Sequence, residues 1–427
     1  MDQTVANDIT PQLSKPQLVD SLTVHHASTD VLWTDVQGNP DTDDKPASPE
    51  AFKTMFCLRP NITFLNHGSF GATPRAVFAV YQGWQSYLEQ QPVQFFRDEL
   101  TDYLQRARAS LAAYLSCNLL DVVFVPNATF GVNSVVNSLN LVPGDEVLSS
   151  NQEYGACDHT WQHWSEKRGF SYVKAPMALP FTDNLVNAFW THVTPQTKVI
   201  FLSHITSATA QTLPIKEICA RAREHNILTV IDGAHAPGQL PLNLPDLGAD
   251  IYTGNCHKWL CSPKGAGFLY VHPEQQAHIE PLIVGWRRRN MPSLGSNFQN
   301  DFAFLGTADY SAYLSVPAAI QFQAQHAWGR VQARCHNLLT NAMTQWQQVA
   351  GVSSAYVSPN DYRQMALLEI PTQDDLREVQ PEIWQRTGVE VPFTEHLGRA
   401  YARVSVQGYN GVGDMERLVE VLGTLTK

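Results

Sequence analysis

Residues 253–271 read TGNCHKWLCSPKGAGFLYV, in which a lysine follows the end of an expected strand and a glycine-rich turn leads into another strand. Lys258 is followed by Trp259 and Leu260, an apolar setting in which an ammonium group would be poorly solvated. Burial disfavours the charged form of lysine and makes the neutral, nucleophilic amine accessible. A lone lysine is more often a solvated surface charge, and Lys264, in the glycine-rich turn, fits that description better. The stretch therefore predicts a reactive lysine at the end of a strand.

Two other motifs also place polar groups at the ends of expected strands. VIDGAHAPG (230–238) contains a strand that ends on Asp232, at the edge where α/β sheets hold ligands. PNATFGVNSVV (126–136) opens a helix, and its backbone N–H groups and the hydroxyl of Thr129 suit a phosphate. Taken alone, the acid is better explained as a turn cap and the helix start as an ordinary N-cap. Together, and in the order phosphate turn, acid and lysine, the three motifs are a far more specific signal than any one of them alone.

Apolar runs in the middle of the chain alternate with helical stretches. These runs are 121–126, 145–150, 198–205, 227–234, 249–255 and 267–272. Strands that are apolar on both faces and separated by helices are typical of a mostly parallel sheet in an α/β fold. After about residue 310 long helices and then short strands predict a smaller α+β domain. We therefore expect a partly mobile N-terminal extension at 1–62, a large domain at 63–308 and a C-terminal domain at 309–427.

Composition limits the possible partners. The chain has 427 residues, of which 44% are apolar and 16% charged, and its formal net charge is -11. This charge argues against nucleic acid or an anionic membrane as the main partner, because both attract cationic surfaces. Seven cysteines without a CxxC pair indicate thiols in a reducing compartment. Because the first residues lack signal-peptide features and no apolar stretch is long enough to span a membrane, we expect a soluble cytoplasmic protein without a metal site.

Several segments carry a resemblance to a known family. They are FLNHGSFGATP (64–74), DGAHAPG (232–238), YTGNCHKWLCSPKGAGFL (252–269), GTADYSAYLSVPAAI (306–320) and RVSVQGYN (403–410). On these motifs the chain, from about Phe64 onward, resembles the class V aminotransferase family of fold-type-I pyridoxal 5'-phosphate (PLP) enzymes, and within it the isopenicillin N epimerase-like branch. The resemblance implies an α/β large domain with a mostly parallel seven-stranded sheet, a smaller C-terminal α+β domain and a homodimer.

The same resemblance implies roles in cofactor binding. Lys258 would bind PLP as a Schiff base and, once released by substrate, move the α-proton, while Asp232 would keep the pyridine nitrogen protonated. The family more often has a serine at the position of Asn255, so that phosphate contact is a departure from the pattern. The other implied contacts are Ala128, Thr129, Asn255 and His257 at the phosphate, Ser207 and His235 at the phenolic oxygen and ring, Tyr154 on the exposed ring face, and Thr307 at the phosphate of the neighbouring subunit's cofactor.

Substrate contacts follow from the resemblance as well. Arg403 would grip the α-carboxylate, because a guanidinium fork suits a bidentate bond. Asn66, His67 and Ser69 would line the substrate entrance. The arginine run 287–289 could attract an acidic substrate, but a solvated turn explains it more simply.

A second proton-transfer group is expected opposite Lys258. Tyr154 and Cys157 lie three residues apart, so a helix would put both on one side, and either could give or take a proton. For Cys157 a small buried core thiol is the more frequent explanation. The sequence leaves the choice between them open.

The resemblance determines the cofactor better than the reaction. An epimerase or racemase acting at Cα of an amino-acid substrate is the first expectation, and a C–S lyase similar to the hercynylcysteine sulfoxide lyases or an aminotransferase is the alternative. Persulfide chemistry is disfavoured, because the segment 355–368 contains no cysteine and Cys335 falls within a helical pattern. A non-catalytic protein on a decayed enzyme fold is the remaining class, against which the intact Asp232, Lys258 and Arg403 argue.

Overall fold

The computed structural model describes residues 46–180, 184–286, 295–372 and 374–425. The expected extension, as far as residue 45, and the arginine run 287–289 lie outside the described residues. Within these ranges, no helix combines the length and the apolar character that crossing a membrane requires.

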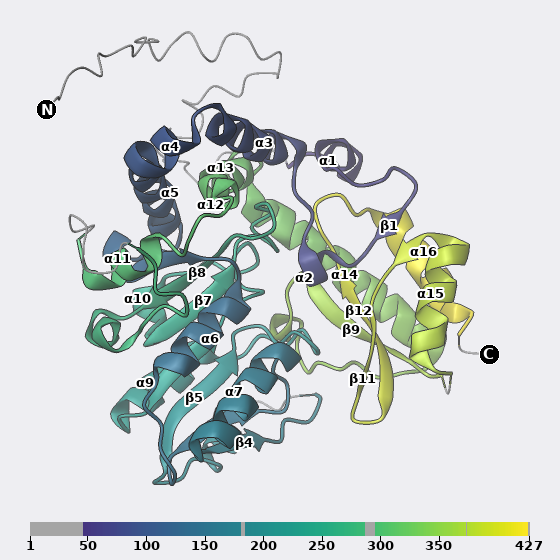
Figure 1. Cartoon of the computed structure of the whole chain (residues 1–427). Helices are drawn as coiled ribbons and strands as arrows, with labels where there is room; N and C mark the ends of the chain where they lie inside the picture. The colour runs from purple at the N-terminus through teal and green to yellow at the C-terminus, as the bar shows by residue number, and fades with distance from the viewer. Residues whose placement is uncertain (1–45, 181–183, 287–294, 373, 426–427) are drawn as a thin grey trace, which may run out of the picture.

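A seven-stranded sheet forms the centre of the larger part of the molecule (Figure 1). Its order is β2-β8-β7-β6-β5-β3-β4; β8 runs antiparallel to both neighbours, and the other adjacent pairs are parallel. The strands are β2 (Val122–Val125), β3 (Glu146–Ser150), β4 (Ser171–Ala175), β5 (Thr197–Ser203), β6 (Leu228–Asp232), β7 (Ile251–Asn255) and β8 (Gly267–Val271). The prediction of a mostly parallel seven-stranded α/β sheet is confirmed.

Both faces of this sheet are buried, which explains why its strands are almost continuously apolar. In β5, Val199 and Phe201 belong to one hydrophobic core, while Ile200 and Leu202 belong to the other. Burying each such side chain contributes about 1.5–3 kcal/mol. The first core lies under helices α6 (Ala128–Ser138) and α7 (Gly155–Arg168), and the second under α5 (Leu100–Tyr114) and α9 (Ile215–Glu224).

The remaining α-helices lie around these layers or in the C-terminal part. They are α1 (Pro49–Met55), α2 (His67–Phe70), α3 (Arg75–Gln90), α4 (Pro92–Gln94), α8 (Leu185–Trp190), α10 (Leu244–Leu247), α11 (Asn297–Ala303), α12 (Ser311–Leu314), α13 (Val316–Gln325), α14 (Trp328–Ala350), α15 (Leu376–Thr387) and α16 (Val412–Gly423). Helix α13 packs against α3 and α5, whereas α14 packs against β9 and α16.

The C-terminal part has a smaller sheet of its own. Strands β9 (Met365–Ile370), β11 (Phe393–His396) and β12 (Arg399–Ser405) form an antiparallel sheet in the order β11-β12-β9. A short parallel pair joins β1 (Thr63–Phe64) to β10 (Val389–Glu390). The smaller C-terminal α+β unit is therefore present, and the domain limits at residues 62 and 308 stay predictions.

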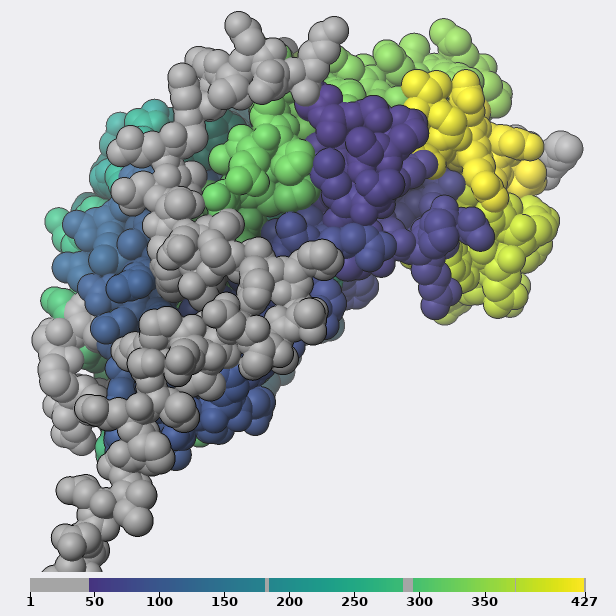
Figure 2. All heavy atoms as spheres, turned by 90° about the horizontal axis from the view of Figure 1, so that it is seen from above, coloured from purple at the N-terminus to yellow at the C-terminus, as the bar shows by residue number. Residues whose placement is uncertain are grey.

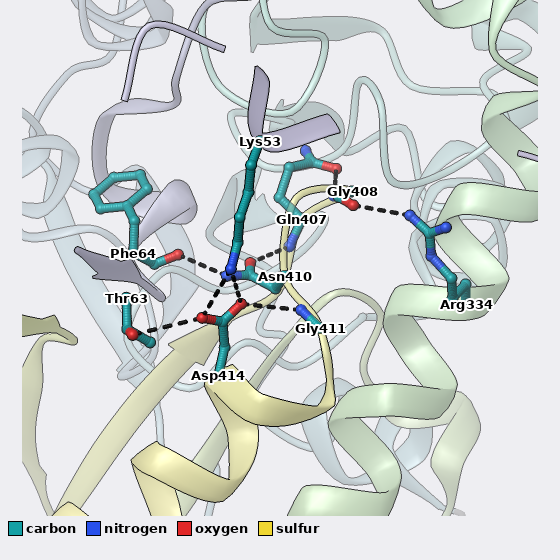
Figure 3. A network of polar contacts seen from close by, with 9 residues as sticks. All are labelled: Lys53, Thr63, Phe64, Arg334, Gln407, Gly408, Asn410, Gly411 and Asp414. Atoms are coloured by element: carbon teal, nitrogen blue, oxygen red, sulfur yellow. Dashed lines mark hydrogen bonds and ion pairs between the residues drawn. The ribbon is translucent and has the colours of Figure 1, made fainter. Parts of the chain in front are cut away.

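Polar contacts hold the described N-terminal segment to this C-terminal part. The side chains of Lys53 and Asp414 form an ion pair with an Nζ–Oδ2 distance of 3.2 Å, and the Thr63 hydroxyl donates to the same carboxylate (Figure 3). The Asn410 amide donates to the carbonyl of Phe64 at 3.2 Å. Figure 2 shows the purple N-terminal residues beside the yellow C-terminal helices. This docking positions the segment that follows β1, which reaches the cavity described next.

Candidate active site

A cavity of about 320 Å³ lies at the carboxyl ends of the central strands. Strand β5 ends at Ser203, β6 at Asp232 and β7 at Asn255, and all three of these residues line the cavity. Parallel α/β sheets hold ligands at this edge, where the chain passes from strands into helix N-termini. The sequence-predicted residues that line the cavity are Ser69, Ala128, Thr129, Tyr154, Ser207, Asp232, His235, Asn255, His257 and Lys258.

The amine of Lys258 lies against a histidine. Its Nζ is 3.1 Å from Nε2 of His235, and the indole N–H of Trp259 donates to Nδ1 of the same ring at 3.2 Å. Because an indole can only donate, a neutral His235 carries its proton on Nε2 and directs it at the lysine nitrogen. Burial lowers the pKa of His235 well below its ordinary range and lowers the pKa of Lys258 to about 8. The arrangement favours the uncharged, nucleophilic form of Lys258.

The pKa of Lys258 predicts how covalent capture of an aldehyde depends on pH. A protonated amine cannot attack a carbonyl, so the rate of adduct formation should rise as the pH passes through about 8, the pKa to which burial lowers this group. A solvated lysine would show the same rise near its ordinary pKa of about 10.4. Stopped-flow absorbance after mixing cofactor-free protein with PLP measures the rate. A rise that begins only near the ordinary lysine pKa would contradict the prediction.

Asp232 is a buried carboxylate at the end of β6. Its Oδ1 accepts a hydrogen bond from the backbone N–H of Ala234 at 2.9 Å, and its Oδ2 lies 3.5 Å from Sγ of Cys157. In the part of the chain that the structure describes, no basic side chain forms an ion pair with it. Burial raises its pKa. A buried carboxylate that faces a cavity without a cationic partner suits a protonated ring nitrogen.

Cys157 lies behind this carboxylate and does not line the cavity. It packs with Val147 and Trp161 in the core under α6 and α7. Burial, followed by the charge of Asp232, raises the pKa of the thiol well above its ordinary value. A protonated thiol can donate a weak hydrogen bond to Asp232.

Glu153 was not predicted from the sequence, yet it is buried beside this cluster. The hydroxyls of Ser150 and Ser203 each lie 2.6 Å from one of its carboxyl oxygens, and Ser203 lines the cavity. Burial, and to a smaller extent the charge of Asp232, raises the pKa of Glu153 to about 8. An uncharged Glu153 leaves Asp232 as the negative charge of the cluster. The sequence signal was an acid directly before Tyr154, just after an expected strand.

Two substitutions at Glu153 should show whether PLP binding depends on the shape of this side chain or on its charge. Glu153→Gln keeps an uncharged group of the same size, so we expect PLP to bind as tightly as it does to the parent at neutral pH. Glu153→Ala leaves two buried hydroxyls without a partner and should weaken PLP binding by about tenfold. Absorbance titration of the cofactor-free variants measures both. If the glutamine variant binds as weakly as the alanine variant, the carboxylate charge is needed and the assignment is wrong.

The N-terminus of α6 forms the turn predicted to hold phosphate. The side chain of Asn127 caps the helix by accepting the backbone N–H of Phe130 at 2.9 Å. The N–H of Ala128 donates to Oδ1 of Asn255 at 2.9 Å, so these two predicted phosphate contacts are bonded to each other. The hydroxyl and the backbone N–H of Thr129 have no partner within the described ranges. Thr129 is therefore the free donor of the turn.

His257 completes this end of the cavity. Its Nδ1 donates to the carbonyl of Ala266 at 2.9 Å, which determines the tautomer of the neutral ring. Burial lowers the pKa of His257 to about 4, so the unprotonated Nε2 remains for a cavity ligand.

Tyr154 places an aromatic ring in the cavity. It is the N-cap residue of α7, it is 46% exposed, and it lines the cavity. The amine of Lys258 is 5.9 Å from the centre of its ring. An aromatic face and an amine are thus available within one cavity.

Arg403 lies on β12 of the smaller sheet and reaches the cavity wall. Its Nη1 donates to the carbonyl of Ser207 at 2.7 Å, and its Nη2 donates to the hydroxyl of Ser69 at 2.9 Å. Both serines line the cavity. Burial lowers the pKa of Arg403 to about 10, and none of the described carboxylates pairs with it. The guanidinium is therefore held in place without a counter-ion.

His67 and Asn66 were predicted at the substrate entrance, but neither lines the cavity. Both instead form hydrogen bonds with residues around it. His67 is buried, with Nδ1 2.9 Å from the hydroxyl of Tyr409 and Nε2 3.1 Å from the carbonyl of Lys258. Burial lowers the pKa of His67 to about 3. Asn66 accepts a hydrogen bond from the Ser69 hydroxyl at 2.5 Å, and Ser69 is the member of this motif that lines the cavity.

Thr307 does not line the cavity of its own chain. It is exposed, in the segment between α11 and α12. Its predicted contact with a neighbouring subunit's cofactor is therefore not tested by a single chain.

Gly71, the second glycine of the LNHGSFG motif, has a backbone conformation and surroundings that leave no room for a side chain. Its φ is +71°, and a Cβ built there would lie 2.2 Å from the carbonyl oxygen of His257. Gly71→Ala should therefore strain the backbone and displace the segment next to Lys258, lowering the free energy of unfolding by about 1–3 kcal/mol and weakening PLP binding. Chemical denaturation and cofactor titration measure the two effects. Gly83→Ala, where a Cβ meets open space, is the control. Parent-like values for the Gly71 variant would contradict the prediction.

The arrangement fits the cofactor that the sequence motifs imply. A helix N-terminus with a free donor suits the phosphate, a buried carboxylate without a counter-ion suits the ring nitrogen, and a lysine whose pKa is lowered by burial suits the aldehyde. The ring of Tyr154 lines the same cavity. The guanidinium of Arg403, which has no counter-ion among the described residues, donates a hydrogen bond to Ser69 of the cavity wall.

Comparison with known proteins gives the family. The family model for aminotransferase class-V matches residues 72–418. Isopenicillin N epimerases of Amycolatopsis lactamdurans and Streptomyces clavuligerus are 33% and 31% identical, over 87% and 88% of this chain and 96% and 98% of theirs. An L-cysteine desulfhydrase-like protein of Epichloe uncinata is 30% identical over 63% of this chain and 64% of its own length.

A solved structure agrees with the fold. The cysteine desulfurase from Thermococcus onnurineus superimposes with a TM-score of 0.78 at 19% identity, covering 89% of this chain and 98% of that one. The family model and the two epimerases extend over most of the chain, including the cavity residues from Ala128 to Arg403. The chain belongs to the class-V aminotransferase family.

Proposed function

We propose that this chain is a PLP-dependent epimerase that inverts the configuration at Cα of an amino-acid substrate, with Lys258 joined to the cofactor as a Schiff base. The observation that carries the proposal is the buried amine of Lys258, 3.1 Å from Nε2 of His235 in a cavity that also contains Asp232. The relatives that match almost the whole chain are named isopenicillin N epimerases, which favours epimerisation among the reactions of the family.

The proposed cofactor contacts follow from the geometry. When bound, PLP supplies an electron sink for the bond broken at Cα. Asp232 pairs with the ring nitrogen and keeps its proton there, and Thr129 holds the phosphate at the N-terminus of α6. His257 borders this end of the cavity, where its unprotonated Nε2 can accept a hydrogen bond from the ligand. The bond between Asn255 and Ala128 keeps that turn in shape.

Arg403 binds the α-carboxylate of the substrate. Two hydrogen bonds to Ser207 and Ser69 fix the guanidinium before substrate arrives, so little side-chain freedom is lost on binding. A carboxylate held at this wall orients the Cα–H bond relative to the cofactor.

Inversion needs one proton-transfer group on each face of Cα. Lys258 serves one face, and we assign the other to Tyr154, because its ring lines the cavity and its centre lies 5.9 Å from the amine. Cys157 is the weaker candidate, since its thiol contacts Asp232 behind the cavity. We assign Cys157 to the support of that carboxylate.

A homodimer in the cytoplasm is the proposed working form. Thr307 is exposed and is free to approach a second copy, and at the mouth of the cavity Phe70 is 74% exposed. A second copy that covers Phe70 and brings Thr307 to the phosphate accounts for both features. Seven free cysteines are consistent with a reducing compartment.

The alternative is a C–S lyase, which the desulfhydrase-like relative favours. Such a lyase expels a sulfur group from Cβ, and it needs no cysteine nucleophile in the cavity. None of the described cavity residues is a cysteine, and Cys335 is buried on α14, so persulfide transfer finds no thiol there.

Isotope exchange distinguishes these reactions. Pure holoenzyme is incubated with a panel of amino acids and amino-acid-terminated peptides in deuterated water. Deuterium at Cα together with loss of optical rotation supports the epimerase. Pyruvate with sulfide or a sulfenate product would replace it by the lyase, and a keto acid with an aminated cofactor would replace it by an aminotransferase.

A further inference from the structure

A second cavity, of about 180 Å³, lies between β2, α5, α6 and the segment 302–313. Apolar and aromatic side chains form most of its wall, and the rings of Phe124 and Tyr313 stack with centres 5.0 Å apart. Arg108, on α5, supplies the basic group of the lining. None of the roles proposed above uses this cavity.

Arg108 is a buried charge without a partner. It is 3% exposed, and its Nε and Nη2 have no hydrogen-bond partner. No described carboxylate forms an ion pair with it, and burial lowers its pKa to about 10. Removing a guanidinium from water without a counter-ion is strongly unfavourable, so an unpaired one of this kind calls for an explanation.

The acid in the same cavity does not neutralise it. Asp309 accepts hydrogen bonds from Gln85 at 2.8 Å and from Tyr81 at 3.1 Å, and its other oxygen accepts the backbone N–H of Ser311 at 2.8 Å. These three donors occupy the carboxylate and lower its pKa despite burial. The carboxylate oxygens of Asp309 are thus bonded to groups other than Arg108.

We propose that this cavity binds a small carboxylate with an aromatic or branched apolar body. Arg108 would pair with the carboxylate, and the body would pack against Phe124 and the neighbouring rings. Charge complementarity selects the anion, because a carboxylate is the partner that a guanidinium binds with two parallel hydrogen bonds. The apolar wall selects the body, because the polar atoms of a small hydrophilic anion would remain unbonded there.

This cavity is adjacent to the candidate active site. Pro126 lines both cavities and directly precedes the turn at 127–129 that faces the proposed phosphate position. Phe124, from β2, lies two residues earlier in the chain. Binding of a ligand at Arg108 should therefore affect the turn at 127–129 by way of β2 and so alter the absorbance of bound PLP.

Calorimetric titration of the holoenzyme tests the proposal with two probes of the same shape, 3-phenylpropanoate and the uncharged 3-phenylpropanamide. We expect the parent to bind the carboxylate at least about tenfold more tightly than the amide, the effect of one charge-assisted hydrogen-bonded pair. Arg108→Leu should remove this preference. Arg106→Leu, which removes an exposed arginine from the same helix, should keep it.

Further variants distinguish this site from other places a carboxylate could bind. Arg403→Leu should keep the preference, because the probe does not depend on the first cavity. Arg108→Lys, which keeps the charge, should retain part of it and decides the test if the leucine variant does not fold. Equal binding of both probes to the parent, or loss of the preference with Arg403→Leu alone, overturns the proposal. A change in sedimentation mass caused by Arg108→Leu also overturns it, because a second copy would then be the partner of Arg108.

Discussion

The Lys258→Ala variant is expected to lose its covalent bond to PLP and to process substrate about 10³-fold or more slowly than the parent. The substitution removes both the amine that attacks the aldehyde and the base on one face of Cα. His235, whose Nε2 lies 3.1 Å from the amine, cannot replace it, because Nε2 carries the ring proton and Nδ1 already accepts the indole N–H of Trp259. Borohydride reduction followed by mass spectrometry locates the adduct, and deuterium exchange at Cα gives the rate.

A matched control is available in the same stretch of sequence. Lys264 also lines the cavity but lies in the exposed turn, with its Nζ 3.4 Å from the hydroxyl of Thr73. Lys264→Ala should therefore retain the reduced adduct on Lys258, whatever its effect on the rate. If Lys258→Ala still yields a borohydride-stable adduct and parent-like exchange, the amine of the reaction lies elsewhere.

Much of the fold could be predicted because the buried strands can be recognised in the sequence by their runs of apolar residues. A strand that is buried on both faces is apolar at most positions, as it is at Val199, Ile200, Phe201 and Leu202. The chain passes from each such strand into a polar turn, so Asp232 could be placed at the ligand edge before the structure was known. The mostly parallel α/β sheet predicted from this pattern is confirmed, as are the family and the seven strands that the resemblance implied.

Side-chain pairing could not be predicted in the same way, because it joins residues far apart in the sequence. The bond between Ala128 and Asn255, and the one between Arg403 and Ser207, depend on how distant segments meet in space. Glu153 was missed because an acid after a strand gives no sign of its burial. The catalytic roles of the cavity residues stay predictions, because arrangement alone does not measure a rate.

The Asp232→Ala variant is expected to keep the covalent bond to Lys258 but to lose about 10²–10³-fold in the rate of Cα–H exchange. The carboxylate stabilises a proton on the ring nitrogen, and an unprotonated ring accepts electrons from Cα less readily. Ala234 and Cys157 hold the two carboxylate oxygens in place. The neighbouring acid, Glu153, is bonded to the hydroxyls of Ser150 and Ser203 instead. The retained adduct distinguishes this loss from that of Lys258→Ala. The measurements are the same borohydride and deuterium-exchange assays.

Further variants and a cofactor analogue distinguish the effect of the negative charge of Asp232 from the effect of its shape. Asp232→Asn keeps the size of the side chain and should be as slow as the alanine variant, whereas Asp246→Ala, which removes an exposed acid paired with Lys216, should react like the parent. Reconstitution of Asp232→Ala with N-methyl-PLP, whose ring nitrogen carries a fixed positive charge, should recover part of the lost rate. If the asparagine variant exchanges Cα–H at the parent rate, the negative charge is not needed. Asp232 would then act through shape alone, and the proton on the ring nitrogen would have to be stabilised by another group.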